Sequence, residues 1–115
     1  MTADEQLGRT FAALTDPTRR AIVRRLEHGV ATISELAEPF AIKLPAVMKH
    51  LDVLHEAQLI SREKHGRTVT IALAPGPMRE AMRWLARHER FWTPRLDRLV
   101  AHAEARETQL RRTKR

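Results

Sequence analysis

The chain has 115 residues, a formal net charge of +7, 43% hydrophobic residues and no cysteine. This length fits a single domain, and the mixture of hydrophobic and charged residues is typical of a folded protein. The lack of cysteine excludes disulfides and thiolate metal sites, and the acidic N-terminus and short apolar stretches predict neither a signal peptide nor a membrane span. We therefore expect a cytoplasmic protein that does not enter a membrane.

Positive charge is unevenly distributed along the chain. Residues 1–42 carry five arginines and six acidic residues, so the whole excess lies in residues 43–115. A basic chain of this kind most often meets a polyanion, with nucleic acid as the default. A basic tail on a protein that binds no polyanion would account for the composition equally well.

The N-terminal region predicts two short helices. In residues 5–14, Leu7, Phe11 and Leu14 recur at spacings of four and three, the pattern of an amphipathic helix. The stretch TDPTRRAIVRRLEHG, residues 15–29, starts with an Asp-Pro pair that suits the N-cap and the first helical position, and ends with a glycine. It therefore predicts a second helix.

A helix-turn-helix is predicted next. Thr32 and Glu35 have the spacing of a capping box and open a brief helix. The stretch KLPAVMKHLDVLHEAQ then predicts a longer helix over residues 44–57. At 100° per residue its core face holds Val47, Leu51, Leu54 and Gln58, with Leu44 beside them. The short connection between the two helices is typical of a helix-turn-helix.

The charges of helix 44–57 run against the helix macrodipole. Lys43 and Lys49 lie near its start, and Asp52 and Glu56 lie near its end. The opposite arrangement is favoured by roughly 0.3–1 kcal/mol per exposed charge. Entry of the amino end into a DNA groove would explain this order, because the lysines and free backbone N–H groups would face phosphates. The alternative is a solvated helix face with charges scattered by chance.

The following residues predict a β-hairpin. Val69, Ile71 and Leu73 alternate with smaller residues, and Leu59–Lys64 is the expected partner strand, with His65-Gly66 as a two-residue turn. Arginine and lysine surround this tip. A basic hairpin directly after a recognition helix is a wing, and narrow minor grooves attract arginine. The alternative is an ordinary exposed hairpin whose basic residues protect an edge strand.

Two further helices are expected before a basic tail. The first starts at Pro77, and Thr93-Pro94 repeats the cap-plus-proline signal for a second. We assign residues 1–105 to one DNA-binding and dimerisation domain and residues 106–115 to a frayed basic tail.

Aromatic residues concentrate in the last helices. Of the five aromatic residues, three fall within nine positions, more than one side of a small domain needs. Tryptophan and methionine are enriched at interfaces, so we expect a two-fold dimer rather than an intramolecular core. The expected interface residues are Leu7, Phe11, Trp84, Phe91, Trp92, Leu96 and Leu99.

The order of these motifs resembles the ArsR (arsenical-resistance) family of winged-helix repressors. The resemblance rests on FAALTDPTRRAIVRRL (11–26), TISELA (32–37), LPAVMKHLDVLHEAQLI (44–60) and HGR (65–67), and RFWTPRLDRL (90–99) resembles a non-metal branch. It implies a dimeric repressor that binds operator DNA near a promoter, with Lys43 through His50 as the DNA-reading segment. The family often has serine where this chain has Met48, and glycine where it has Gln58, so the operator sequence is left open.

Metal and enzyme chemistry are weakly supported. His88 and His102 lie where some family members hold zinc, but neither has a carboxylate at the required spacing; Glu89 and Glu104 leave only an unorthodox site. The sequence has no glycine-rich phosphate loop and no nucleophile elbow. We therefore expect no metal, no cofactor and no enzymatic activity.

The sequence thus predicts a mainly α winged helix-turn-helix protein with five to six helices and a two-stranded hairpin wing. We expect a homodimeric transcriptional repressor whose two recognition helices lie about 34 Å apart on a pseudo-palindromic operator. The expected DNA contacts are Lys43, Leu44, Pro45, Ala46, Met48, Lys49, His50, Arg62, Lys64 and Arg67. The alternatives are a metal-responsive repressor of the same fold and a winged-helix module that binds a protein or ligand; a small-molecule effector is left open.

Overall fold

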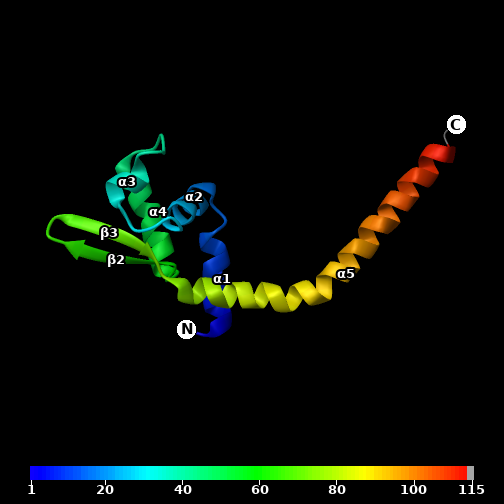
Figure 1. Cartoon of the computed structure of the whole chain (residues 1–115), viewed down its shortest axis with the longest axis horizontal. Helices are drawn as coiled ribbons and strands as arrows, with labels where there is room; N and C mark the ends of the chain where they lie inside the picture. The colour runs from blue at the N-terminus through cyan, green and yellow to red at the C-terminus, as the bar shows by residue number, and fades with distance from the viewer. Residues whose placement is uncertain (114–115) are drawn as a thin grey trace. The chain divides into compact units, whose positions relative to one another are not determined.

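The computed structural model describes residues 1–113 and divides into two compact units, Met1–Ala81 and the chain from Met82 onward. Five helices and three strands occur among these residues (Figure 1). In chain order they are α1 (Ala3–Ala13), α2 (Pro17–Leu26), β1 (Ala31–Thr32), α3 (Ile33–Ala37), α4 (Leu44–Glu56), β2 (Ile60–His65), β3 (Thr68–Leu73) and α5 (Pro75–Thr113). The predicted fold class, mainly α with a hairpin wing, is confirmed.

The sheet has one strand more than the sequence predicts. Its order is β1-β3-β2, and both pairs are antiparallel. In the first pair Ala31 lies opposite Ile71 and Thr32 opposite Thr70. A strand of two residues is too short to show a period-two pattern, which is why the sequence gives no sign of β1.

The hairpin turn lies one residue later than predicted. His65 pairs with Thr68 at the end of the ladder, so the two turn residues are Gly66 and Arg67, and the prediction of His65-Gly66 is wrong. Gly66 has a φ of 63°, and a positive φ at the first turn position is what a type II′ hairpin requires. The turn therefore forms around the one residue that adopts this conformation without strain.

The core lies in the first unit, between α2, α3, α4 and the sheet. Val47, Leu51 and Leu54 of α4 are fully buried, as predicted. Two of the predicted core-face positions are wrong. Leu44 is 51% exposed, because it is the first residue of α4 and precedes the first buried turn. Gln58 is exposed and lies beyond the helix.

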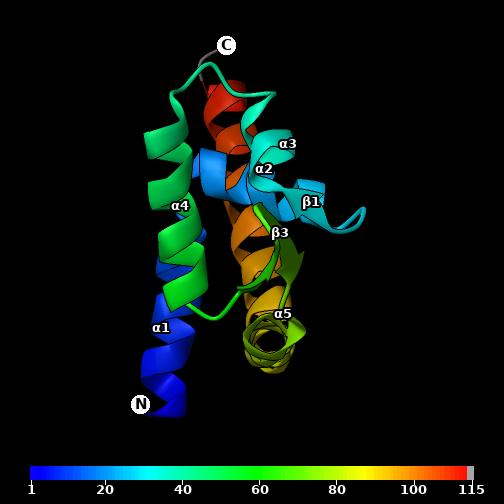
Figure 2. The same ribbon diagram turned by 90° about the vertical axis from the view of Figure 1, so that its left-hand side faces the viewer.

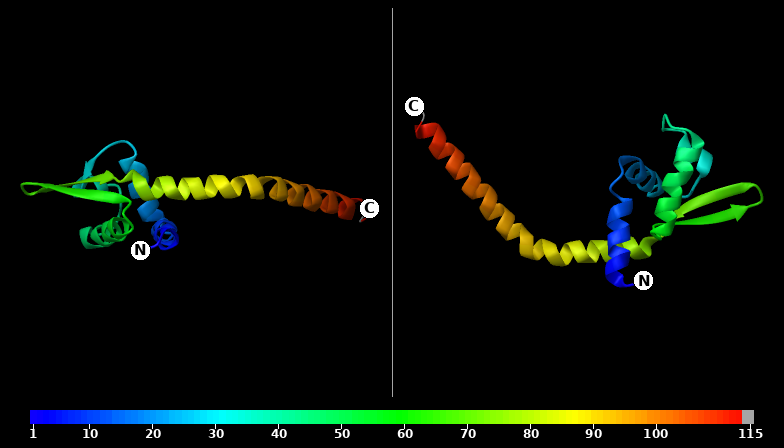
Figure 3. Two further views of the ribbon diagram at one scale, coloured as in Figure 1. Left: turned by 90° about the horizontal axis from the view of Figure 1, so that it is seen from below. Right: turned by 180° about the vertical axis from the view of Figure 1, so that it is seen from behind.

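Helix α5 is continuous, so the predicted break at Thr93-Pro94 is wrong. Pro94 lies inside the helix. Figure 3 shows α5 as one unbroken helical ribbon. A proline removes one backbone hydrogen bond, which kinks a helix without having to end it. Arginine side chains donate to nearby carbonyls, Arg95 Nη1 to Phe91 O at 2.7 Å and Arg98 Nε to Pro94 O at 3.3 Å. Of the predicted tail, residues 106–113 form the end of α5, and residues 114–115 lie outside the described part of the chain.

Candidate nucleic-acid interface

The amino end of α4 is open. Lys43 is its N-cap residue and makes no capping hydrogen bond with its side chain. Its carbonyl accepts from the N–H groups of Ala46 at 3.0 Å and Val47 at 3.3 Å, so the helix closes on its own backbone. Lys43, Leu44, Pro45 and Lys49 are exposed, and Ala46 is half-buried. This end therefore presents two cations and small or apolar side chains to solvent. Figure 2 shows α4 on the near side of the view, with the loop from α3 entering its upper end.

Two predicted contact residues on α4 have partners within the protein. Met48 is half-buried and packs against the hydrophobic core. His50 has 22% of its side chain exposed, and its Nδ1 lies 3.7 Å from Asp16 Oδ2 and 3.4 Å from Arg19 Nη1. Both residues therefore lie at the border of the exposed surface, with Lys49 between them pointing outward.

Asp16 and Arg19 join the start of α2 to the end of α1 and to α4. Asp16 accepts from the backbone N–H of Arg19 at 3.0 Å, which makes it the N-cap of α2 as predicted. This hydrogen bond lowers the pKa of the Asp16 carboxyl, and the nearby His50 and Arg19 act in the same direction. Arg19 Nε also donates to the carbonyl of Ala13 at 2.6 Å. The sequence indicates the cap but not that the same carboxylate would position His50.

Arg62 is held against α4. Its Nη2 donates to Asp52 Oδ1 at 2.6 Å, and its side chain is 28% exposed. Its Nε is buried and has no hydrogen-bond partner. Asp52, which the sequence presents as a misplaced acid on α4, thus has an internal partner on β2. This ion pair was not predicted from the sequence, although opposite charges on consecutive elements are a usable signal.

The tip of the β2–β3 hairpin is basic and exposed. Lys64, His65 and Arg67 are all exposed, and His65 Nε2 lies 3.4 Å from Glu63 Oε1. The hairpin follows α4 directly in the chain and extends away from the helices of its unit (Figure 1). The first unit therefore carries exposed cations on two adjoining elements, Lys43 and Lys49 at α4 and Lys64 and Arg67 at the hairpin.

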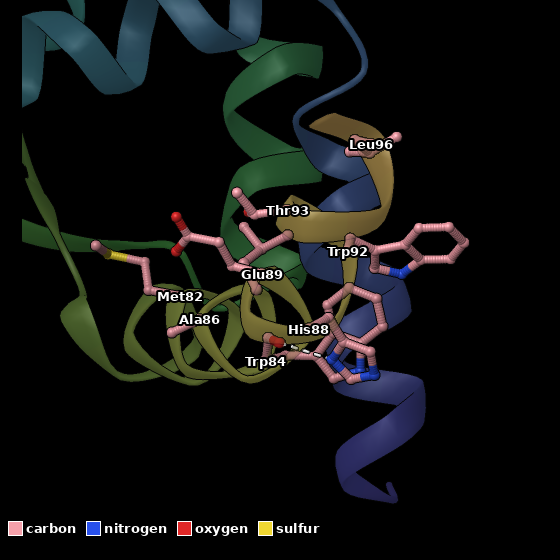
Figure 4. A pocket seen from close by; sticks show the side chains of 9 residues that line it. Met82, Trp84, Ala86, His88, Glu89, Trp92, Thr93 and Leu96 are labelled. Atoms are coloured by element: carbon pink, nitrogen blue, oxygen red, sulfur yellow. Dashed lines mark hydrogen bonds between the residues drawn. The ribbon is translucent and has the colours of Figure 1, made fainter. Parts of the chain in front are cut away.

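The apolar side chains of α5 are largely uncovered. Trp92 and Leu96 are each 50% exposed and Leu99 is 62% exposed, so an intramolecular core does not account for them. Leu7 and Phe11 on α1 and Trp84 on α5 are half-buried. A groove of about 570 Å³ runs along α5 and is lined by Met82, Trp84, Leu85, Ala86, His88, Glu89, Trp92, Thr93 and Leu96 (Figure 4).

Histidines of α5 do not gather into a metal site. His88 stacks on Trp84 with ring centroids 4.0 Å apart, and its Nδ1 lies 2.8 Å from the carbonyl of Trp84. Within residues 1–113, no three histidine, cysteine or acidic side chains form a group that could hold a metal ion. The same residues contain no helix that is both long and apolar enough to cross a bilayer.

Comparison with known proteins assigns the family. A family model described as a helix-turn-helix domain matches residues 14–63. The chain is 32% identical over 79 residues to the transcriptional repressor SdpR of Bacillus subtilis, covering 69% of this chain and 88% of SdpR. It is 40% identical over 85 residues to the HTH-type transcriptional regulator Rv2034 of Mycobacterium tuberculosis, covering 74% and 77%. The crystal structure of the ArsR family transcriptional regulator RHA00566 matches with a TM-score of 0.73 and 44% identity, covering 78% of this chain and 93% of that one.

The chain belongs to the ArsR family of winged helix-turn-helix transcriptional regulators. The region matched by the helix-turn-helix model contains α2, α3 and α4 and ends within β2. The open end of α4 in this ArsR-family regulator therefore lies in the part of the chain that carries the helix-turn-helix.

Proposed function

We propose that this ArsR-family regulator is a homodimeric, cytoplasmic repressor that binds operator DNA and has no catalytic role. The observation that carries the proposal is the exposed, uncapped and cationic start of α4, in a unit whose next element is a basic, exposed hairpin. Backbone N–H groups and lysines at a helix start favour phosphate, and a recognition helix reads bases with its N-terminal residues.

The start of α4 enters the major groove in this proposal. Lys43 and Lys49 bind phosphates or guanine edges, since lysine is a common ligand of both. Leu44, Pro45, Ala46 and Met48 offer only apolar side-chain contacts, for which the thymine methyl group is the natural partner. His50 contacts a base edge or the adjacent backbone from the border of this surface.

The hairpin holds the neighbouring backbone. Lys64 and Arg67 bind phosphates there, and Arg67 at the turn is suited to the minor groove, where narrow width attracts arginine. Arg62 is paired with Asp52 at 2.6 Å, so a DNA contact would require it to exchange partners. We assign Arg62 the additional role of fixing the base of the wing against α4.

Dimerisation supplies the second half-site contact. The proposed interface consists of Leu7, Phe11, Trp84, Phe91, Trp92, Leu96 and Leu99, and the exposed face of α5 supports it. The two recognition helices are expected to lie about one DNA turn, roughly 34 Å, or a multiple of it apart on a pseudo-palindrome.

Trp92→Ala should raise the dimer dissociation constant in sedimentation equilibrium, and Val30→Ala, which changes an exposed apolar residue of the first unit, serves as the control. A sedimentation profile unchanged by Trp92→Ala would contradict the interface.

The function is tested by selecting bound fragments from a random DNA pool and footprinting the selected site. We expect enrichment of an inverted repeat and two protected half-sites separated by whole helical turns. Affinity should fall steeply with salt, because binding releases phosphate counterions. Adding zinc or a chelator to the same assay tests the metal-responsive alternative. Recovery of no enriched sequence, with weak binding to all fragments, would contradict operator recognition.

A further inference from the structure

The side chain of Arg19 on α2 connects the end of α1 to the border of the exposed surface of α4. Its Nε donates to the carbonyl of Ala13 at 2.6 Å, and its Nη2 donates to that of Ala12 at 3.3 Å. Its remaining nitrogen, Nη1, lies 3.4 Å from Nδ1 of His50. Because the guanidinium group is planar and rigid, the two hydrogen bonds to backbone carbonyls also fix the direction of Nη1.

This contact determines which ring nitrogen of His50 carries the hydrogen. A guanidinium group has only N–H donors and keeps its protons in proteins. In a neutral imidazole one nitrogen donates and the other accepts, so Nδ1 accepts from Arg19 and Nε2 carries the hydrogen. We propose that Arg19 is a positioning residue for DNA recognition, which holds His50 in the Nε2–H form so that Nε2 donates to an acceptor on the operator. This proposal rests on the operator binding proposed above and adds the atom with which His50 contacts DNA.

The Nε2–H group of His50 is directed away from α2. The two nitrogens lie on opposite edges of the imidazole ring, so a ring whose Nδ1 faces Arg19 presents Nε2 in the other direction. His50 lies at the border of the exposed surface of α4, next to Lys49. A donor at this place suits a phosphate oxygen or the N7 of a purine, and it disfavours the amino groups of adenine and cytosine, which are donors themselves.

Asp16 is the group that competes for the same nitrogen of His50. Its Oδ2 lies 3.7 Å from Nδ1, which is beyond hydrogen-bond distance, and it already accepts from the backbone N–H of Arg19 at 3.0 Å. A carboxylate can only accept, so it favours a hydrogen on Nδ1, the opposite of what Arg19 requires. Removal of the Arg19 guanidinium group should therefore let the ring hydrogen move to Nδ1.

Imidazole nitrogen chemical shifts of the free protein test the role of Arg19. They are recorded at pH values high enough that the shifts no longer change, and the His50 signals are assigned by their loss in His50→Gln. The unchanged protein and Asp16→Asn should show the Nε2–H form, and Arg19→Met should gain the Nδ1–H form that donates to Asp16. Asp16→Asn is the matched control, because it also alters the start of α2 but leaves the contact from Arg19.

Two results of this measurement would overturn the role of Arg19. The first is an Nδ1–H form in the unchanged protein, which requires no variant to fold. The second is an Nε2–H form that persists without change in an Arg19→Met protein whose circular dichroism shows a native fold.

Amide substitutions test the donor in the complex with DNA. Glutamine places its side-chain NH₂ group near the position of Nε2, whereas the shorter asparagine places it near Nδ1. On the selected operator His50→Gln should therefore keep its affinity within about threefold, and His50→Asn should lose about tenfold or more. Arg19→Met should weaken binding in the unchanged background but not in His50→Gln, because glutamine has no tautomer to fix. An equal loss in both backgrounds would mean a merely structural role and would overturn the proposal.

Modified operators distinguish the two possible acceptors. Deazapurines lack N7, and methylphosphonates lack the phosphate charge. On the operator without the contacted acceptor, His50→Asn should bind as well as the unchanged protein. Equal affinities of His50→Gln and His50→Asn for unmodified DNA would overturn the contact from Nε2. Failure of the unchanged protein to bind any operator would overturn the proposed function, while the chemical shifts of the free protein would still decide the role of Arg19.

Discussion

At the residue scale, the contact between Asp52 and Arg62 changes the interpretation of α4. The sequence presents Asp52 as an acid at the unfavourable end of a helix, which DNA binding alone was expected to explain. The structure gives it an internal role, since Arg62 donates to it at 2.6 Å across to β2. The inverted charge order of α4 therefore has two sources: Asp52 pairs with the hairpin, and the two lysines at the start of the helix remain exposed.

The pair should contribute measurably to stability. Asp52→Ala and Arg62→Ala should each lower the free energy of unfolding, and a double-mutant cycle should give a coupling of about 1 kcal/mol, because Arg62 is largely buried and loses its acceptor. Urea denaturation of the four proteins at low and high salt measures this coupling. Additive effects of the two substitutions would contradict a direct interaction.

The Asp16 carboxylate should make stability depend on pH. Its pKa in the folded state lies below its ordinary value, mainly because it accepts the backbone N–H of Arg19. Its stabilising contribution is therefore present above the unfolded-state pKa and is lost as pH falls through the folded-state pKa. Asp16→Asn keeps an N-cap side chain without the charge. We expect its melting temperature to be lower than that of the unchanged protein at neutral pH, with the difference shrinking in acid; a difference independent of pH would contradict the assignment.

Among the secondary-structure elements, the C-terminal cap of α4 explains the residue preference at position 58. The N–H of Leu59 donates to the carbonyl of Leu54 at 3.0 Å, and that of Gln58 donates to His55 at 2.9 Å, the two bonds of a Schellman motif. Gln58 stands where this motif needs a positive φ, and it has a φ of 60°. This explains in physical terms why glycine suits this position.

Gln58→Gly should therefore stabilise the protein. Removing the side chain relieves the cost of a left-handed conformation, partly offset by the greater freedom of glycine in the unfolded chain, so we expect a gain of about 0.5–1 kcal/mol. Chemical denaturation measures it. Glu56→Gly, in the last helical position, should instead destabilise. Destabilisation by both substitutions would contradict the cap assignment.

Local signals predicted most elements, and contacts distant in sequence account for the rest. The caps at Asp16 and Thr32 are read correctly because each cap lies within three residues of its partner. The strand β1 and the Asp52–Arg62 pair depend on segments brought together only by folding. The prediction at Pro94 was wrong because Thr93-Pro94 has the sequence pattern of a helix start, whereas α5 continues through it.

At the scale of the whole molecule, function depends on what each unit leaves uncovered. The first unit buries the inner face of α4 completely and leaves its cationic start and the hairpin tip exposed. The second unit leaves an apolar helical face exposed, which a second copy would cover. An ArsR-family regulator with these two surfaces would dimerise through one of them and bind two DNA half-sites at once through the two copies of the other.

We expect the start of α4 to bind DNA phosphates, and the salt dependence of binding by Lys49→Ala is the decisive test. Affinity for the selected operator is measured between low and physiological salt for this variant, the unchanged protein and Arg24→Ala, which removes an exposed cation of α2. If each protomer loses one phosphate contact, the slope of log affinity against log salt should become less steep by about 2 per dimer, with the fold intact by circular dichroism. Arg24→Ala should keep the original slope. A Lys49→Ala variant with unchanged affinity and unchanged slope would show that the start of α4 does not bind DNA phosphates.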